Sequence, residues 1–419
     1  PTNWRRKSRS DWGQLGMNYK ETAIGRIPID WDTQQIKDVT TTVTDYVANG
    51  SFASLAKNVH YKSTPDIAVL IRLVDYNNHF KGDFVYIDEH AYEFLSKTKL
   101  YGNEIIISNV GANVGTVFRC PRLDCKMSLA PNAIMVKFKQ NNDFYFHWLR
   151  GTQGQHMLQS IVTGSAQPKF NKTNFKEMLV PVPPIKIQRE ISSILNCLDE
   201  KIELNNKINE NLQQQMQAIY KEWFGEMDAS QERKTLSDIC TYSKERVSVS
   251  ELDVNTYFST ENMQPEKAGA VEASGLPTIV QTTACHIGDT LVSNIRPYFK
   301  KIVYCYENCG CSADVLCFVP VQPKYSAYLY STLYEDKFFD FMVAGSKGTK
   351  MPRGDKRQIM TYPVVFPSDE QLSKFNSLAM PILEQIHSNR CENARLSKIR
   401  NALLPKLMSG EIDVSGISH

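Results

Sequence analysis

Acidic residues beside lysines are the first residues in this sequence whose types could support phosphodiester hydrolysis. Asp/Glu-x-Lys triplets of the nuclease type occur at Asp199-Glu200-Lys201 and Glu335-Asp336-Lys337. Two-metal hydrolysis also needs a further carboxylate on a neighbouring strand, whereas both triplets fall in segments with helical spacing. We therefore interpret both triplets as solvated helix faces and assign no catalytic residue.

Glycine-rich segments and clustered cysteines also lack the spacing of a cofactor site. Residues 345–350 and 109–115 are rich in glycine but have neither the GxxxxGK[ST] nor the GxGxxG order. The segment 182–185, Val-Pro-Pro-Ile, lacks the asparagine and the aromatic ring of an amino-methyltransferase motif. Four cysteines lie close in sequence without a paired CxxC: Cys305, Cys309, Cys311 and Cys317. The sequence therefore predicts no cofactor and no metal in this chain.

The chain contains an internal repeat. Ser108-Asn109-Val110 recurs 185 residues later as Ser293-Asn294-Ile295, and Val162-Thr163-Gly164-Ser165 recurs 181 residues later as Val343-Ala344-Gly345-Ser346. A third pair consists of proline-rich segments, Pro181-Val182-Pro183-Pro184 and Pro363-Val364-Val365-Phe366-Pro367. Offsets this similar indicate two successive copies of one unit.

Each copy ends in a long segment with the heptad spacing of a coiled coil. Apolar positions alternate by four and three residues from Ile191 to Trp223, and adding 184 to each gives a second seam from Phe375 to Leu407. A helix over Gln188 to Phe224 would be roughly 55 Å long at 1.5 Å per residue. We interpret the two segments as helices that act as a spacer.

Two asparagines interrupt the apolar seam of each predicted helix. They are Asn205 and Asn209 in the first helix and Asn389 and Asn393 in the second. An asparagine on such a seam costs stability but sets register, because its amide needs a partner at the same level. We predict that Asn205 and Asn209 lie within side-chain reach of the second helix. The alternative is that each helix packs separately and its asparagines face solvent.

The segments ahead of the proline-rich exits share one mixed α/β pattern. A turn and a strand lead to each Ser-Asn pair, and the next strands are predicted at Val114 to Phe118 and Ile302 to Tyr306. A helix-like run follows in each copy, at Phe144 to Ile161 and Tyr325 to Met342, and glycines at 151 and 154 weaken the first. The expected fold class is mixed α/β with two similar domains.

Positive charge gathers in one polar loop of each copy. Residues 164–176 carry three lysines and no acid, and residues 345–357 carry five basic residues and one acid. A charge run alone is usually a solvated loop, but its recurrence and the interleaved Gly, Ser, Thr and Asn favour phosphate binding. Residues 296–301 of the second copy add cations and aromatic rings. We predict that DNA is contacted by Ser165, Gln167, Lys169, Lys172, Arg296, Lys300, Ser346, Lys347, Lys350, Arg353 and Arg357.

Composition limits the class of protein. The 419 residues are 42% hydrophobic and 22% charged, as in soluble globular proteins, and no stretch approaches 18 consecutive apolar residues. The ten cysteines follow no disulfide framework and no signal-peptide pattern opens the sequence, so we expect reduced thiols in the cytoplasm. Residues 1–16 hold four basic residues and one acid, which accounts for the whole net charge of +3. Because they precede Met17, they may be an added extension.

The sequence resembles the specificity subunits of type I restriction-modification enzymes from Met17 onward. The segment 21–31 resembles the family's opening to its first recognition domain, and Pro183-Pro184 with Gln188 resembles a conserved exit. The terminal segment 403–412, Leu-Leu-Pro-Lys-Leu-Met-Ser-Gly-Glu-Ile, resembles the second exit. None of these segments is a catalytic motif, but their order and duplication are specific. Residues 1–16 do not match.

The resemblance implies five segments and several partners. The segments are the extension at 1–16, recognition domain 1 at 17–187, helical spacer 1 at 188–232, recognition domain 2 at 233–368 and helical spacer 2 at 369–419. It implies an antiparallel helical pair that docks two methyltransferase subunits, joined by restriction and translocase subunits. S-adenosylmethionine, ATP and Mg²⁺ would belong to those partners. Two similar but different domains predict an asymmetric, bipartite double-stranded DNA target.

Two other functions remain open from the sequence. A self-contained DNA methyltransferase or nuclease would bind S-adenosylmethionine or cleave DNA with a metal as the purified chain. A coiled-coil scaffold that binds only protein would leave the mobility of duplex DNA unchanged in the presence of its partners. The recognised bases cannot be read from the sequence, because loop geometry sets which side chains reach the base edges.

Overall fold

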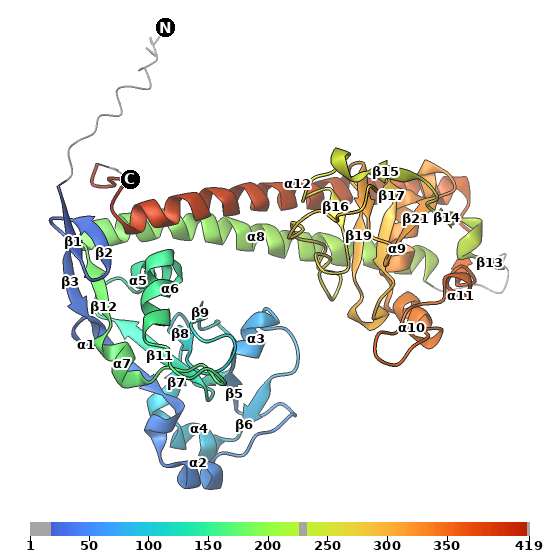
Figure 1. Ribbon diagram of the computed structural model, residues 1–419. Helices are drawn as coiled ribbons and strands as arrows, with labels where there is room; N and C mark the ends of the chain where they lie inside the picture. The colour runs from blue at the N-terminus through green and yellow to red at the C-terminus, as the bar shows by residue number, and fades with distance from the viewer. Residues whose placement is uncertain (1–17, 226–232, 417–419) are drawn as a thin grey trace. The chain divides into compact units, whose positions relative to one another are not determined.

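The computed structural model describes residues 18–225 and 233–416 and divides into two compact units (Figure 1). Unit 1 combines the chain up to Lys201 with the residues from Arg395 onward, and unit 2 spans Ile202–Ala394. The first strand begins at Tyr19. The extension predicted at 1–16 lies outside the described residues.

Unit 1 is built on two four-stranded sheets. The first sheet is antiparallel, in the order β4 (Thr40–Asp45), β11 (Ala133–Phe138), β8 (Ile105–Ser108), β9 (Val117–Arg119). The second has the order β6 (Val85–Ile87), β5 (Ala68–Ile71), β10 (Lys126–Leu129), β7 (Lys99–Leu100), with β5 and β10 parallel. Two antiparallel ribbons pair β1 (Tyr19–Thr22) with β2 (Gly25–Pro28) and β3 (Asp32–Gln35) with β12 (Leu179–Val182). Because β8 is buried along its whole length, it fixes the position of the loop that follows it.

Unit 2 repeats this arrangement. Its first sheet is antiparallel, in the order β14 (Cys240–Tyr242), β21 (Val315–Pro320), β18 (Thr290–Ser293), β19 (Ile302–Tyr304). Its second has the order β15 (Arg246–Ser248), β17 (Gln281–Cys285), β20 (Cys309–Cys311), β16 (Tyr257–Phe258). The strand β13 (Arg233–Thr235) pairs with β22 (Pro363–Val365). Strands β18 and β19 lie 185 residues after β8 and β9, so the predicted repeat is confirmed as a structural repeat.

The predicted single helix before each basic loop is wrong in both copies. Unit 1 has α5 (Asn142–Arg150) and α6 (Thr152–Ser160), and unit 2 has α9 (Ser326–Tyr334) and α10 (Asp336–Ala344). The residue between each pair is extended, with ψ of 165° at Gly151 and 142° at Glu335. Extended backbone ends the ladder of helical hydrogen bonds, so each run folds as two short helices.

Gly154 is required where α6 turns back on α5. A Cβ atom there would lie 2.1 Å from the carbonyl oxygen of Trp148, which no side chain can tolerate. The remaining short helices of unit 1 are α1 (Ile36–Val39), α2 (Phe52–Asn58), α3 (Leu73–Asn77), α4 (Glu89–Phe94) and α7 (Lys172–Glu177). Unit 2 adds α11 (Lys356–Ile359).

Two 40-residue helices, α8 (Ile185–Phe224) and α12 (Asp369–Met408), follow the proline-rich exits, as predicted (Figure 1). The first begins at Ile185, three residues before the predicted Gln188, directly after Pro184. Proline is favoured just ahead of the first turn, because its missing N–H costs nothing there. Within unit 2 the two helices run antiparallel, since Asn205 bonds Asn393 while Asn209 bonds Asn389.

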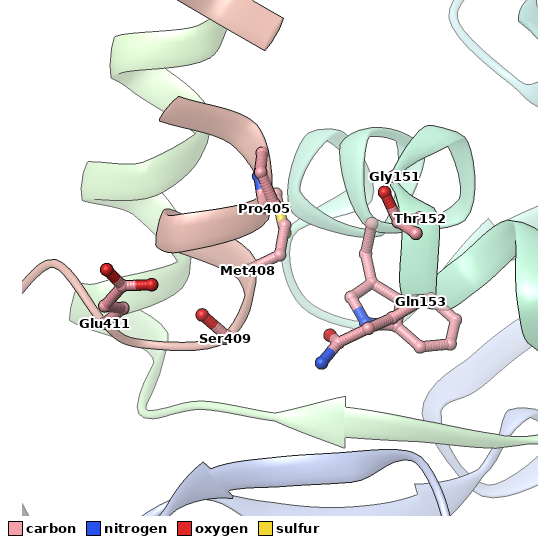
Figure 2. A pocket seen from close by; sticks show the side chains of 8 residues that line it. Gly151, Thr152, Gln153, Pro405, Met408, Ser409 and Glu411 are labelled. Carbon is pink, nitrogen blue, oxygen red and sulfur yellow. The ribbon is translucent and has the colours of Figure 1, made fainter. Parts of the chain in front are cut away.

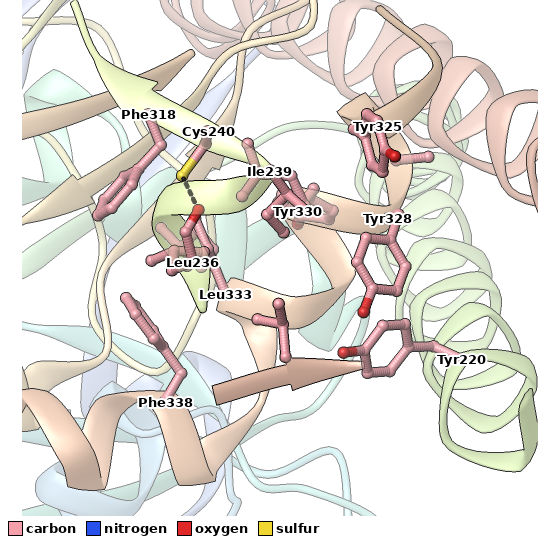
Figure 3. Close-up of a cluster of buried hydrophobic side chains, with 14 of the residues drawn as sticks. Tyr220, Leu236, Ile239, Cys240, Phe318, Tyr325, Tyr328, Tyr330, Leu333 and Phe338 are labelled. Atoms are coloured by element: carbon pink, nitrogen blue, oxygen red, sulfur yellow. Dashed lines mark hydrogen bonds between the residues drawn. The ribbon is translucent and has the colours of Figure 1, made fainter. Parts of the chain in front are cut away.

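Each unit has its own apolar core. In unit 1 the core joins α5 to the sheet, and the rings of Phe138 and Tyr145 stack with centroids 3.9 Å apart. In unit 2 the core joins the sheet and α9 to the long helices, and Figure 3 shows Tyr220 of α8 facing Tyr328 of α9. The Tyr220 hydroxyl bonds Thr332 Oγ1 at 2.9 Å, so its buried polar end is satisfied.

Candidate nucleic-acid interface

The basic loop of unit 1 is closed by a short antiparallel bridge. Thr163 pairs with Lys169, and Lys169 also pairs with Val110 at the end of β8. The Gly111 N–H donates to the Pro168 carbonyl oxygen at 2.9 Å. Gly164 turns the loop with a φ of +86°, a conformation that favours glycine. The loop is therefore held against the end of a buried strand.

The basic loop of unit 2 is closed in the same way. Lys347 pairs with Arg353, and Arg353 pairs with Ile295 at the end of β18. The Arg296 N–H donates to the Pro352 carbonyl oxygen at 2.8 Å. Gly348 turns this loop with a φ of +100°. The predicted equivalence of the two basic loops is confirmed.

The residue-by-residue match at this loop differs from the predicted one. The sequence comparison aligned Gly164 with Gly345 at an offset of 181. In the structure Gly164 corresponds to Gly348, at an offset of 184, because both have positive φ inside the same bridge. Gly345 has a φ of −91° and ends α10. The repeated Gly-Ser letters at 345–346 are therefore a coincidence of sequence, and Ser346 closes a helix, its hydroxyl donating to the Val343 carbonyl oxygen at 2.7 Å.

Several of the predicted cations already have carboxylate partners. Four ion pairs are formed: Lys172 with Asp45 at 2.9 Å, Lys300 with Asp336 at 2.9 Å, Lys347 with Asp355 at 2.6 Å and Arg353 with Asp314 at 3.0 Å. The ammonium of Lys347 lowers the pKa of the Asp355 carboxyl to about 2. Lys267 and then Lys300 lower the pKa of Asp336 to about 2 in the same way. Phosphate binding by these cations would compete with carboxylates.

Other predicted contact residues are open to solvent. Ser165, Gln167 and Lys169 are exposed in unit 1, and Lys350 and Arg357 are exposed in unit 2. Among the described residues, none of the cations Lys169, Lys350 and Arg357 makes a side-chain ion pair. These side chains are the ones best placed to take up phosphates without first losing a partner.

Sequence reasoning missed an asparagine that stands beside each loop. Asn109 and Asn294 follow β8 and β18, and the side-chain Oδ1 of each is buried without a hydrogen-bond partner among the described residues. A buried acceptor left unpaired is costly, so a group that arrives with a donor would be favoured there. Both residues belonged to the repeated Ser-Asn pair, which was the available signal.

The four asparagines predicted to set the helix register meet inside unit 2. Asn389 Nδ2 donates to Asn209 Oδ1 at 2.8 Å, and Asn205 Nδ2 donates to Asn393 Oδ1 at 2.9 Å. Asn205 Nδ2 also donates to Glu392 Oε2 at 2.7 Å. The prediction of side-chain reach is confirmed, and the alternative of separately packed helices is wrong.

The two nuclease-type triplets have structural ion pairs, and the solvated-face interpretation is wrong for their aspartates. Asp199 on α8 accepts from Arg400 at 2.6 Å and from Arg150 at 3.5 Å, all within unit 1. Asp336 opens α10 and accepts from Lys267 and Lys300. Each aspartate therefore holds elements of its own unit together.

Five cysteines of unit 2 lie in one small apolar cluster. They are Cys285, Cys305, Cys309, Cys311 and Cys317, and all are buried free thiols. Cys309 Sγ lies 3.6 Å from Cys305 Sγ, and Cys317 Sγ lies 3.3 Å from Asp289 Oδ2. Within the described ranges, no group of three or more His, Cys, Asp or Glu side chains has an arrangement that could hold a metal ion. The cluster is packed as part of the core.

A cavity of about 220 Å³ in unit 1 lies where α6 begins and α12 ends. Figure 2 shows Gln153 on one side and Pro405, Met408 and Ser409 on the other. The Trp148 Nε1 and Gln153 Oε1 atoms are buried there without partners among the described residues. No helix in the described ranges combines the length and apolar character of a membrane span.

Known proteins place this architecture in a family. The family model described as "Type I restriction modification DNA specificity domain" matches residues 28–214. The type I restriction enzyme MjaIX specificity subunit of Methanocaldococcus jannaschii is 23% identical over 433 residues, which cover 94% of this chain and 96% of that protein. This chain belongs to the specificity subunits of type I restriction-modification systems.

Further likenesses agree with this family. The HindI specificity subunit of Haemophilus influenzae is 22% identical over 370 residues, 68% of this chain and 80% of that protein. The crystal structure of the S subunit from M. genitalium matches with a TM-score of 0.57 at 14% identity, covering 90% of this chain and 96% of that one, and it supports the fold. As a specificity subunit, the chain is a non-catalytic DNA-recognition subunit that works in a complex with other restriction-modification subunits.

Proposed function

We propose that this specificity subunit reads an asymmetric, bipartite double-stranded DNA site, with one half-site read by each unit. The observation that supports this is the duplicated basic loop, anchored in both units to the end of the central buried strand. The residues around the two loops differ, so two half-sites of different sequence are expected. Exposed cations at equivalent places suit the phosphates that flank each half-site.

The proposal extends to the partners and their cofactors. Two methyltransferase subunits dock on the helical pair α8 and α12, and restriction and translocase subunits join them. S-adenosylmethionine, ATP and Mg²⁺ bind to those subunits, while this chain supplies sequence recognition. The complex works in the cytoplasm, where it meets chromosomal and incoming DNA.

Methylation mapping tests the function. The subunit is expressed with its methyltransferase partners in a host that lacks adenine methylation, and N6-methyladenine is mapped across the genome. One bipartite motif with two different halves is expected, and it should vanish when this chain is omitted. Methylation without the chain, or S-adenosylmethionine binding by the chain alone, would contradict the proposal.

A further inference from the structure

The turn after the central strand has the same length in both units but different chemistry. Eight residues separate β8 from β9 in unit 1, and eight separate β18 from β19 in unit 2. In each unit this turn is hydrogen-bonded to the basic loop through a proline carbonyl. The two turns are therefore two versions of one feature at the candidate interface.

Two glycines of the first turn are replaced by cations in the second. Gly111 and Gly115 have φ of +101° and +91°, and at the equivalent places Arg296 and Lys300 have φ of +49° and +51°. The left-handed region costs free energy for any residue with a Cβ, and glycine avoids that cost. The second turn thus accepts backbone strain in order to carry side chains that glycine lacks.

Between these cations the second turn exposes two aromatic rings. Tyr298 is 46% exposed and Phe299 is 37% exposed, with ring centroids 4.7 Å apart. The equivalent residues of unit 1 are Asn113 and Val114. Met351 on the adjoining basic loop is 52% exposed, which adds to an apolar surface bordered by cations. Large exposed rings on a rigid turn mark a contact surface.

The turn is held firmly at its base. The Glu266 N–H donates to the Phe299 carbonyl oxygen and the Lys267 N–H donates to that of Lys300, both at 2.9 Å. Lys301 Nζ donates to the Thr260 carbonyl oxygen at 2.6 Å. Lys267 and Lys300 share Asp336. The rings are therefore presented in one orientation before any partner arrives.

We propose that Tyr298 and Phe299 stack against bases at one step of the half-site read by unit 2, while Arg296 and Lys350 neutralise the flanking phosphates. Nucleic acid is the partner that combines apolar ring faces with dense negative charge, and side chains of this kind enter base steps and stack on bases. This inference rests on the proposed function and assigns the contact to unit 2 alone.

Fluorescence of 2-aminopurine tests the inference. The specificity subunit is assembled with its methyltransferase subunits, and 2-aminopurine replaces single bases along the half-site of unit 2, excluding the base that is methylated. Binding should change the fluorescence at one step, because the probe reports stacking. The double variant Tyr298→Ser/Phe299→Ser should lose that change and bind the target about tenfold to a hundredfold more weakly, with an unchanged salt slope.

Two further variants separate this role from a structural one. Arg296→Gly should bind DNA more weakly while its thermal midpoint stays the same or rises, because glycine relieves the left-handed strain. Ile287→Ala is the control, since Ile287 is 68% exposed at the opposite end of β18 and should leave binding unchanged.

Several outcomes would overturn the inference. They are an unchanged affinity of the double variant, no probe signal at any step, and loss of the methyltransferase subunits from the double variant, which would make the rings a protein contact. Failure of the wild-type complex to bind its own methylated motif would instead contradict the proposed function.

Discussion

Asn389 and Asn209 face each other across the two long helices, with Nδ2 of Asn389 donating to Oδ1 of Asn209 at 2.8 Å. Asn389 is buried and Asn209 is partly buried, so neither amide can readily turn to water. A second pair, Asn205 with Asn393, lies one helical turn away. An antiparallel pair of helices has many nearly equivalent registers on an apolar seam, and these amides favour one of them.

Removing one asparagine of a pair should cost more than removing both. Asn389→Leu leaves the Asn209 amide facing a hydrocarbon, and we expect the free energy of unfolding of unit 2 to fall by about 1–3 kcal/mol. Asn209→Leu/Asn389→Leu should recover much of that loss. Urea titrations followed by Trp223, which lies in unit 2, would measure the cycle, with Asn211→Leu as an exposed control on α8. Additive effects would show that the two amides do not depend on each other.

The cations of the second basic loop should supply affinity without choosing bases. Replacing Lys350, Arg353 and Arg357 by alanine should weaken binding to matched and mismatched duplexes alike. The slope of log affinity against log salt should become shallower by up to about 0.9 per lost phosphate contact. Fluorescence anisotropy at several salt concentrations measures both quantities.

A matched control for this variant uses lysines that pair within their own helix. Lys207 pairs with Glu203 and Lys374 pairs with Glu370. Their replacement by alanine should leave the salt slope unchanged. If the loop variant keeps the wild-type affinity and slope, the loop faces solvent and the turn at 296–301 is the better candidate.

Exchange of one recognition domain should change one half-site. Replacing residues 233–368 with the same region of another specificity subunit leaves unit 1 and its basic loop intact. The expected methylation motif keeps one half and gains a new second half, as genome-wide N6-methyladenine mapping would show. A change in both halves would mean that the two units do not read independently.

The stability of unit 1 should depend on pH through His147. This side chain is buried, and burial lowers its pKa to about 4, despite the 2.8 Å hydrogen bond between its Nε2 and Asn196 Oδ1. Below the unfolded pKa of about 6.5 the unfolded chain takes up a proton that the folded unit refuses. Stability should therefore fall as pH drops from about 6.5 towards 4, by up to about 3 kcal/mol, and be constant above that window.

The pH effect can be measured locally. Hydrogen exchange of the α5 amides at pH 5 and pH 7.5 follows the unit that contains His147. His147→Gln keeps a polar group near Asn196 but does not titrate, so its stability should change less between the two pH values. An equal pH effect in both proteins would assign the effect to other groups.

The sequence by itself determined the repeat, the two long helices and the pairing of their asparagines. These features depend on periodicity and on constant offsets, which are local properties of the chain. A seam that repeats every seven residues can be buried only on a helix, and an asparagine on it needs a partner at its own level. The sequence also placed the two basic loops, because their charge recurs at equivalent distances from the strands.

The tertiary structure decided which of these side chains are free to act. Lys172 and Lys300 are neutralised by Asp45 and Asp336, residues 127 and 36 positions away, and no local pattern indicates such partners. The break at Glu335 also has no local signal, because glutamate is a good helix former. The left-handed backbone of Arg296 follows from its hydrogen bond to Pro352 across the interface. Long-range contacts override local preference at these positions, since burial and pairing outweigh propensities of well under 1 kcal/mol per residue.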